Sequence, residues 1–85
     1  MKLKGKVAIV TGGAQGIGKA ISKRLADDGA SVVIFDMKET GAETAKEIGP
    51  QALFLKTDCT KKSEVETNVA MAIEKFEKID ILVNN

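Results

Sequence analysis

The chain has 85 residues, of which 44% are hydrophobic and 29% charged, and its formal net charge is +1. This composition is typical of one small globular domain, and a net charge so near zero does not suggest nucleic acid or an anionic membrane as a partner. Histidine, tyrosine and tryptophan are absent and Cys59 is the single cysteine, which excludes an internal disulfide and leaves few ligands for a transition metal.

Four strongly apolar, β-branched segments recur along the chain and predict four strands. The first, KVAIVT at residues 6–11, is too short for the core of a signal peptide, and no segment reaches the roughly 20 apolar residues that span a bilayer. We therefore expect a cytoplasmic protein with no membrane partner. The other strands are SVVIFD at 31–36, ALFLKTD at 52–58 and DILVNN at 80–85. Nearly continuous apolar runs of this kind indicate strands covered on both faces, as in parallel sheets.

Three helices are predicted between these strands. The first spans residues 16–28 and is ended by Gly29. Its predicted apolar stripe consists of Ile17, Ala20, Ile21 and Leu25.

Two capping boxes predict where the other helices begin. Thr40-x-x-Glu43 opens a short helix at residues 41–48, which we expect to be labile because its apolar face is thin. Ser63-x-x-Glu66 opens the most clearly amphipathic helix of the chain. The apolar face of the short helix consists of Ala42, Ala45 and Ile48, and that of the longer one of Val65, Val69, Ala72, Ile73 and Phe76.

The resulting order, βαβαβαβ, predicts an α/β fold. Right-handed crossovers bring such strands into one doubly wound, Rossmann-like parallel sheet with helices on both faces. A covering helix would be expected after the fourth strand, so the sequence reads as a truncated half of such a fold.

The segment TGGAQGIGKA at residues 11–20 places four of the eight glycines between the first strand and the first helix. Glycines at this junction permit a tight turn, close approach of the backbone to a phosphate and close packing of helix on strand. The free N–H groups at the helix start favour an anion. A plain turn would explain Gly12 and Gly13 but not Gly16 and Gly18 in the first helical turn, so we expect a phosphate site.

Two phosphate-binding loops fit this segment. In a nucleoside triphosphatase loop, a Ser or Thr that holds magnesium would follow Lys19, but position 20 is Ala. A dinucleotide loop requires an acid at the end of the second strand, about 20 residues further on, for the adenosine ribose hydroxyls. Asp36 stands 18 residues beyond Gly18 and favours the dinucleotide loop, although an ordinary loop acid would also fit there.

The loop pattern T-G-x-x-x-G-I-G departs from the usual G-x-G-x-x-G and resembles that of the short-chain dehydrogenase/reductase family. Asp36 after the second strand, Asp58 after the third, and Asn84-Asn85, which begin the family's N-N-A-G segment, match in order. The resemblance covers the whole chain. It implies that residues 1–85 are the N-terminal part of a dinucleotide-binding domain whose cofactor is NAD.

The resemblance also implies roles at the phosphate and ribose end of the cofactor. Gly12, Gly16 and Gly18 would hold the pyrophosphate, with the backbone N–H of Ile17 as a donor. Asp36 would bind the adenosine ribose.

Further roles follow at the adenine and nicotinamide ends. Asp58 would contact the adenine amino group beside Cys59, and Asn85 would lie near the nicotinamide-side ribose while Asn84 braces the strand. Other interpretations remain open: Asp58 could serve the loop before the Ser63 cap, and both asparagines could be turn formers. Cys59 is expected to be a small buried hydrophobe more than a reactive thiol.

Cofactor choice is predicted from the residues around Asp36. Relatives that prefer NADP commonly carry Arg or Lys inside the glycine loop or just after the second strand, where this chain has Gln15 and Met37. Since no cation stands at either position, we expect the Asp36 charge to disfavour a 2′-phosphate. We also expect Gln15 and Met37 to contact the cofactor. Lys38 is the nearest cation and is expected to be solvated.

The function of the family is to interconvert an alcohol and a carbonyl by hydride transfer, using a Ser and a Y-x-x-x-K pair. Those residues lie beyond position 85 in such proteins, so we assign no catalytic residue and expect this chain alone to be inactive. The first hypothesis is that the chain is the NAD(H)-binding part of an oxidoreductase, which would meet its alcohol or ketone substrate only in a longer parent. The second is a stand-alone adenine-dinucleotide-binding module. The third is a non-catalytic fragment that self-associates through the open edge of its fourth strand.

Overall fold

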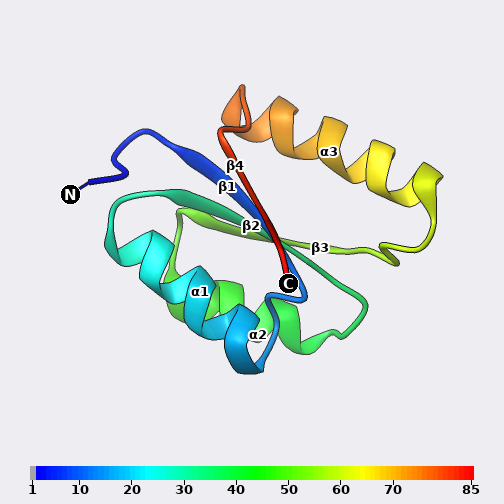
Figure 1. The fold of residues 1–85 in the computed structure, drawn as a ribbon, viewed down its shortest axis with the longest axis horizontal. Coiled ribbons are helices and arrows are strands. Elements are labelled where there is room, and N and C mark those ends of the chain that lie inside the picture. Colours follow the sequence, from blue (N-terminus) through cyan, green and yellow to red (C-terminus); the bar gives the residue numbers. More distant parts are fainter. Residues whose placement is uncertain (1) are drawn as a thin grey trace.

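A computed structural model describes residues 2–85 and contains one parallel sheet of four strands. The strands are β1 (Val7–Thr11), β2 (Ser31–Asp36), β3 (Ala52–Lys56) and β4 (Ile81–Asn84), and they lie in the order β3-β2-β1-β4 (Figure 1). β1 is central: its residues pair with β2 from Val7↔Ser31 to Thr11↔Phe35, and its opposite side pairs with β4. The Rossmann-like α/β fold expected from the sequence is confirmed.

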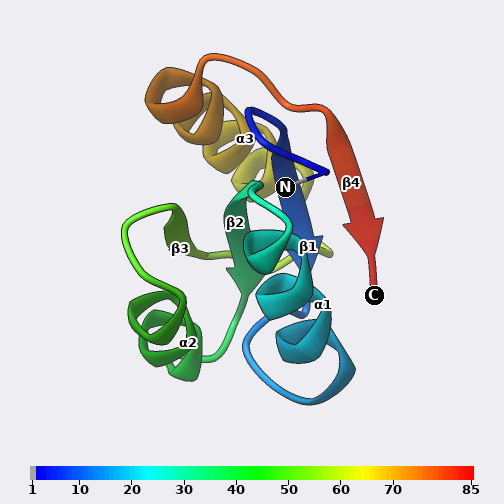
Figure 2. The ribbon, with the colours of Figure 1, turned by 90° about the vertical axis from the view of Figure 1, so that its left-hand side faces the viewer.

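The helices cover the two faces of the sheet unequally. α1 (Gly16–Asp27) and α2 (Thr40–Ile48) lie side by side on one face, and α3 (Lys62–Phe76) lies alone on the other (Figures 1 and 2). Strand order reverses at β1, since the chain adds β2 and β3 on one side and β4 on the other. In open parallel sheets this reversal leaves a crevice at the carboxyl ends of the central strands, where ligands bind.

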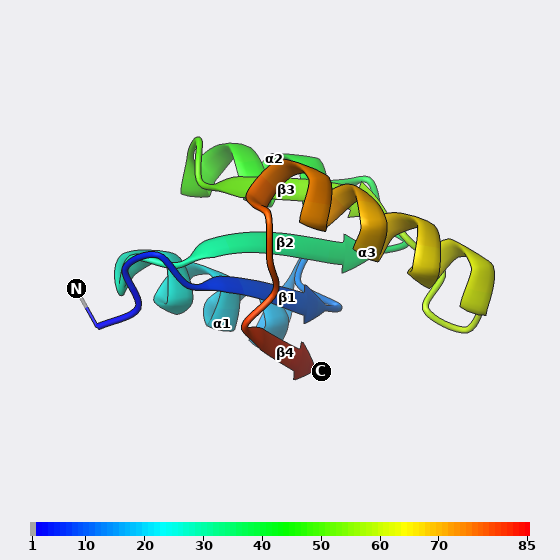
Figure 3. The same cartoon turned by 90° about the horizontal axis from the view of Figure 1, so that it is seen from above.

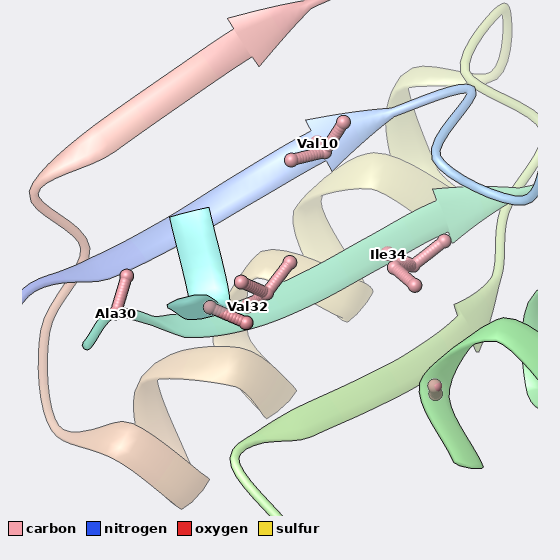
Figure 4. Close-up of a cluster of buried hydrophobic side chains, with 6 residues drawn as sticks. Val10, Ala30, Val32 and Ile34 are labelled. Carbon is pink, nitrogen blue, oxygen red and sulfur yellow. The ribbon is translucent and has the colours of Figure 1, made fainter. Parts of the chain in front are cut away.

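Alternate residues of the strands fill a separate apolar core on each face. On the α1/α2 face, Val10, Ala30, Val32 and Ile34 are fully buried (Figure 4). On the α3 face, the buried residues are Ile9, Val33, Phe35 and Ala72. Burial of β2 from both sides explains why SVVIF is an unbroken apolar run.

The buried stripes of α1 and α2 differ from the prediction. In α1 the buried residues are Gly18, Ser22 and Ala26, Ile21 and Leu25 are half-buried, and Ile17 and Ala20 are exposed. In α2 the buried face consists of Gly41, Thr44 and Ala45, whereas the expected Ala42 is exposed. Both helices therefore approach the sheet closely through small residues, and hydrophobicity alone did not mark the buried side.

On α3, only Ala72 is fully buried, and Val65, Val69 and Phe76 are half-buried. Ile73, which was expected in the stripe, has 43% of its surface exposed. α3 is tilted across the sheet and covers β2 and β3 more than β4 (Figure 3).

Neither expected capping box is formed. α2 begins at Thr40 and α3 at Lys62, so Thr40 and Ser63 lie inside their helices, and neither N-cap residue donates or accepts a side-chain cap hydrogen bond. Turns start both helices early: Gly41 N–H donates to the Lys38 carbonyl, and Lys61 N–H donates to the Asp58 carbonyl. Gly29, with φ +100°, does end α1 as expected.

The remaining differences concern strand ends, because β1, β3 and β4 are each one or two residues shorter at their ends than predicted. Within residues 2–85, no helix is long and apolar enough to cross a membrane.

Candidate functional site

The glycine loop leaves the carboxyl end of β1 and folds back on the first turn of α1. Gly12 and Gly16 have φ of +67° and +59°, a backbone conformation that favours glycine. A Cβ on Gly18 would overlap the carbonyl oxygen of Gly12 and lie 2.7 Å from its carbonyl carbon. A Cβ on Gly16 would meet nothing within 4 Å, so the backbone faces open space there. The loop is thus closed toward the protein and open on its outer side.

The amino end of α1 is available to an anion. Its N-cap residue, Gln15, has extended backbone and makes no side-chain cap hydrogen bond, and no acidic residue lies in the first turn. The first N–H groups of a helix have no partner within the helix. Ile17, whose N–H is one of them, is 73% exposed. These donors and the helix dipole suit a phosphate.

Asp36 lies at the end of β2, beside this loop. Its Oδ2 accepts the N–H of Ala14 at 3.1 Å, and its Oδ1 accepts the N–H of Lys38 at 3.0 Å. A carboxylate has about four lone-pair sites, so each oxygen can accept one further hydrogen bond. Asp36 therefore braces the glycine loop and still has acceptors for a diol.

A groove of about 340 Å³ connects the ends of β1, β2 and β3. It joins several residues that the sequence proposed for the cofactor, because parallel strands end at the same edge of the sheet. Met37 stands 59% exposed at its rim. The lining residues are Gly12, Phe35, Asp36, Met37, Lys38, Thr57, Asp58, Cys59 and Thr60.

Asp58 holds the loop that follows β3. Its Oδ1 accepts the backbone N–H of Thr60 at 3.0 Å and the Thr60 hydroxyl at 2.6 Å. These bonds, with a smaller contribution from the Lys61 charge, hold the pKa of the Asp58 carboxyl below its usual value. The loop role considered for Asp58 is therefore real, and Oδ2 makes no hydrogen bond within residues 2–85.

Cys59 was expected to be buried, but its side chain is exposed. The Asp58 loop turns outward here, and Cys59 lines both the 340 Å³ groove and an apolar groove beside α3. Partial burial, then the negative charges of Asp58, Asp36 and Glu64, raise the pKa of its thiol. The residue is therefore a protonated thiol at neutral pH and a poor nucleophile.

The two asparagines at the end of the chain face the start of the glycine loop. Asn84 Oδ1 accepts the Thr11 hydroxyl at 3.2 Å, and Thr11 Oγ1 accepts the Asn85 N–H at 3.0 Å. Asn85 Nδ2 donates to the Gly12 carbonyl at 3.3 Å. These bonds tie β4 to β1 at the point where strand order reverses.

Three residues that the sequence did not suggest hold the loops in place. The Thr44 hydroxyl of α2 donates a hydrogen bond to the Ala14 carbonyl. Two side chains of α3 bond to the segment after β3. Glu64 Oε1 accepts the Asp58 N–H at 2.9 Å, and Asn68 Nδ2 donates to Thr57 Oγ1 at 2.7 Å. Glu64 and Asn68 stand four residues apart and share a helix face. Their spacing could have been noticed, but no sequence signal pairs them with residues 57–58, or Thr44 with Ala14.

No group of three or more His, Cys, Asp or Glu side chains among residues 2–85 is arranged to hold a metal ion. The site consists instead of backbone donors and carboxylates.

Residues 6–85 match the family model described as short chain dehydrogenase. Human 3-hydroxyacyl-CoA dehydrogenase type-2 is 42% identical over 83 residues, which are 96% of this chain and 32% of that protein. Sorbitol dehydrogenase of Cereibacter sphaeroides is 42% identical over 86 residues, covering 100% of this chain and 34% of its own. This chain thus spans about a third of the length of the curated relatives it matches.

Solved structures agree with the sequence relatives. The crystal structure of 3-ketoacyl-(acyl-carrier-protein) reductase from Brucella melitensis complexed with NADH is 47% identical with a TM-score of 0.90, and covers 94% of this chain and 33% of that one. Hydroxysteroid dehydrogenase from Escherichia coli is 41% identical with a TM-score of 0.94, over 99% of this chain and 37% of that one.

Proposed function

Since this chain belongs to the short-chain dehydrogenase family, we propose that it is the NAD(H)-binding part of an oxidoreductase that interconverts an alcohol and a carbonyl. The observation that carries the proposal is the position of the Asp36 carboxylate, 3.1 Å from the Ala14 N–H of a glycine loop whose outer side is open. The relative crystallised with NADH, at 47% identity, supports the same cofactor class here.

The residues present fit the adenosine and pyrophosphate part of a dinucleotide. The backbone of Gly12, Gly16 and Gly18 and the Ile17 N–H would hold the pyrophosphate, with Gln15 at the rim. Asp36 would accept the adenosine ribose hydroxyls beside Met37. Asp58 and Cys59, which line the same groove as Asp36, would border the adenine, and Asn85, which donates to the Gly12 carbonyl, would lie near the nicotinamide-side ribose. When bound, NAD(H) would accept or donate hydride, and this chain would bind and orient it.

NAD is preferred over NADP in this proposal because of charge. A 2′-phosphate carries about −2 and would stand against the Asp36 carboxylate, a repulsion on the order of 1 to several kcal/mol at an effective dielectric near 20. The cation Lys56 is already paired with Glu39 at 3.2 Å, and Lys38 contacts Asp36 through its backbone N–H. Neither lysine side chain makes an ion pair with Asp36 in the described structure.

The experiment is a calorimetric titration of the chain with NAD⁺ and with NADP⁺. Asp36→Asn is preferable to Asp36→Ala, because an amide oxygen can still accept the Ala14 N–H while the charge is lost. We expect wild type to prefer NAD⁺, and Asp36→Asn to weaken NAD⁺ and to bring the two dissociation constants together.

Asp58→Asn is the matched control, since it removes a charge from another part of the same groove. It is expected to change both affinities in parallel and to leave their ratio unmoved. Equal affinity of wild type for both cofactors, or a ratio unchanged in Asp36→Asn, would show that Asp36 does not select the cofactor.

Hydride transfer needs groups that this chain does not contain. Without tyrosine or histidine, the 85 residues have neither a phenolic nor an imidazole acid–base group, so we expect no turnover of any alcohol or ketone. The substrate would be chosen by a longer parent. Activity of the pure chain that survives removal of contaminating enzyme would refute this.

A second candidate function is association without catalysis. It is favoured by the apolar side chains beside the open edge of β4, where Leu82 is 67% exposed and lines a groove next to α3. This function predicts oligomers and no response to NAD⁺, so the same titration, together with sedimentation velocity, distinguishes it from the first.

A further inference from the structure

Thr44 is a buried residue in the middle of α2, with 2% of its surface exposed. Its hydroxyl donates a hydrogen bond of 2.7 Å to the carbonyl oxygen of Ala14, 30 residues earlier in the chain and in the centre of the glycine loop. Among the side-chain hydroxyls that are buried within residues 2–85, it is the one that bridges a helix to this loop.

This hydrogen bond differs from the one that a threonine inside a helix commonly makes. Ser and Thr hydroxyls inside helices commonly bond the carbonyl four residues back. Ser22 of α1 does so, donating to the Gly18 carbonyl at 2.9 Å. The Thr44 hydroxyl instead donates to a carbonyl of the glycine loop, outside its own helix. It therefore stabilises the conformation of the loop and not that of α2.

Ala14 is held from both sides as a result. Its N–H donates to Asp36 at the end of β2 and its carbonyl accepts from Thr44, while the residue itself is 2% exposed. The neighbouring Gly13 is pressed inward, because a Cβ there would lie 2.9 Å from Ser22 Oγ and 3.1 Å from Ile34 Cγ2. Fixing both polar groups of Ala14 fixes the direction in which the chain continues to Gly16 and Ile17.

The position of α2 is itself set by a close contact. Gly41 lies three residues before Thr44, on the same face of the helix, and a Cβ on it would overlap the ring of Phe54 in β3. The missing side chain brings α2 near enough to the sheet for Thr44 to reach the loop.

From this chain of contacts we propose that Thr44 is a positioning residue for the pyrophosphate-binding loop, acting through the Ala14 carbonyl. The proposal rests on the function proposed above in one respect: it names NAD(H) as the ligand whose phosphates the loop receives. Thr44 touches no part of the ligand. It holds the loop in the conformation in which the N–H groups at the start of α1 converge on one point.

The first test needs no ligand and uses the wild-type chain. A buried hydroxyl proton in a 2.7 Å hydrogen bond is expected to exchange slowly enough to be seen by NMR and to show a scalar coupling to the Ala14 carbonyl carbon. A Thr44 hydroxyl proton in fast exchange with water, or one without contact to Ala14, overturns the proposal even if no variant folds.

The second test compares Thr44→Val, which keeps the shape and removes the hydroxyl, with Thr44→Ser, which keeps the hydroxyl. Thr44→Val should weaken NAD⁺ about fivefold to tenfold while changing the affinity for adenosine, which lacks phosphates, less than about twofold. It should also speed hydrogen exchange at the Ala14 N–H. Thr44→Ser should restore both properties to within about twofold of wild type.

Thr40→Val is the control, since it makes the same change in α2 at an exposed position whose hydroxyl makes no hydrogen bond to the glycine loop in the described structure. It should leave the NAD⁺ to adenosine affinity ratio unchanged. A purely structural role of Thr44 would weaken NAD⁺ and adenosine alike, and would overturn the proposal. If wild type binds no NAD⁺ but Thr44→Val still speeds exchange at Ala14, the proposed function fails and the positioning of the loop stands.

Discussion

The two faces of the sheet are built from the same four strands but are packed in different ways. On the α1/α2 face, Gly18 and Gly41 allow two helices to lie almost against the backbone and the Phe54 ring, and the core residues are fully buried. On the α3 face, one helix covers the sheet, and Leu82, Met71 and Ile73 retain 67%, 47% and 43% exposure. Every residue that braces the glycine loop from a helix belongs to the first face.

This difference indicates which face of the sheet must be closely packed for a phosphate to bind. A phosphate loop must present several N–H groups to one point, which requires close, unique packing behind it. The α3 face positions only the loop after β3, through Glu64 and Asn68, and it leaves a groove of about 390 Å³ beside β4. Loss of an atom should therefore matter more on the first face than on the second.

The largest effect is expected from Ile34→Ala, which removes a fully buried side chain of the α1/α2 face. The free energy of unfolding should fall by about 2–5 kcal/mol because a cavity is left behind, which can exceed the total stability of so small a domain. Urea unfolding measures it. Leu82→Ala on the other face is the control, with a cost below about 1 kcal/mol. Equal costs would show that the two faces are packed alike.

Gly18→Ala is expected to come next. The added Cβ would overlap the Gly12 carbonyl oxygen and lie 2.8 Å from Asn85 Nδ2, so the loop or α1 must shift, at a cost of about 1–3 kcal/mol. NAD⁺ binding should be lost together with the stability. Ala20→Ser adds an atom at an exposed site of the same helix and should cost about 0.5 kcal/mol or less. A Gly18→Ala protein as stable as wild type would contradict the close approach.

Phe76→Ala tests the α3 face directly. The ring is half-buried among Val69 and other apolar side chains, so its loss should cost about 1–2 kcal/mol, below the 3–5 kcal/mol typical of a fully buried Phe. The difference in urea midpoint between Phe76→Ala and wild type gives the value. A cost as large as that of Ile34→Ala would mean that α3 is packed as tightly as α1.

Leu82→Lys should reduce self-association without a large change in stability. The side chain is exposed on β4, which is an edge strand of the sheet, and a charge there opposes contact between apolar surfaces. Sedimentation velocity should show a smaller average mass than for wild type. Ile17→Lys, at a position 73% exposed beside the glycine loop, is the matched control and should leave the mass unchanged. Association that survives Leu82→Lys would exclude this surface.

The smallest effect concerns acid stability and two carboxylates. The N–H of Val7, donated to Asp80 at 2.9 Å, and the Lys78 ammonium hold the pKa of the Asp80 carboxyl below its usual value. On the α1/α2 side, hydrogen bonds and positive charge from the side chains of Lys23 and Lys19 lower the pKa of the Glu47 carboxyl. Because both folded pKa values lie below the unfolded ones, this stability is present above about pH 4 and is lost as the pH falls through the folded values.

The variants Asp80→Asn and Glu47→Gln should each flatten the acid limb of a plot of urea midpoint against pH. About 0.5 M salt separates the two cases, because it screens the exposed ion pairs of Glu47 but not the backbone hydrogen bond of Asp80. An Asp80→Asn profile identical to that of wild type would show that Asp80 does not contribute to acid stability.

The sequence by itself determined the order of elements, the parallel sheet and the residues at its carboxyl edge. Continuous apolar runs such as VVIF are buried from both sides, and parallel strands must end together, so Asp36 and Asp58 had to lie near the glycine loop. Strand positions and the residues at strand ends depend on residue type and spacing along the chain, so they can be predicted from the sequence.

Only the tertiary structure decided which sides of the helices face the sheet and what braces the loop. Hydrophobicity pointed to Ile17 and Ile73, yet both are exposed, because close approach of a helix depends on small residues and on which neighbours are present. The bonds of Thr44 to Ala14 and of Glu64 to Asp58 join segments with no periodic relation in sequence. Long-range hydrogen bonds depend on where the fold brings two groups, and residue type alone cannot specify that position.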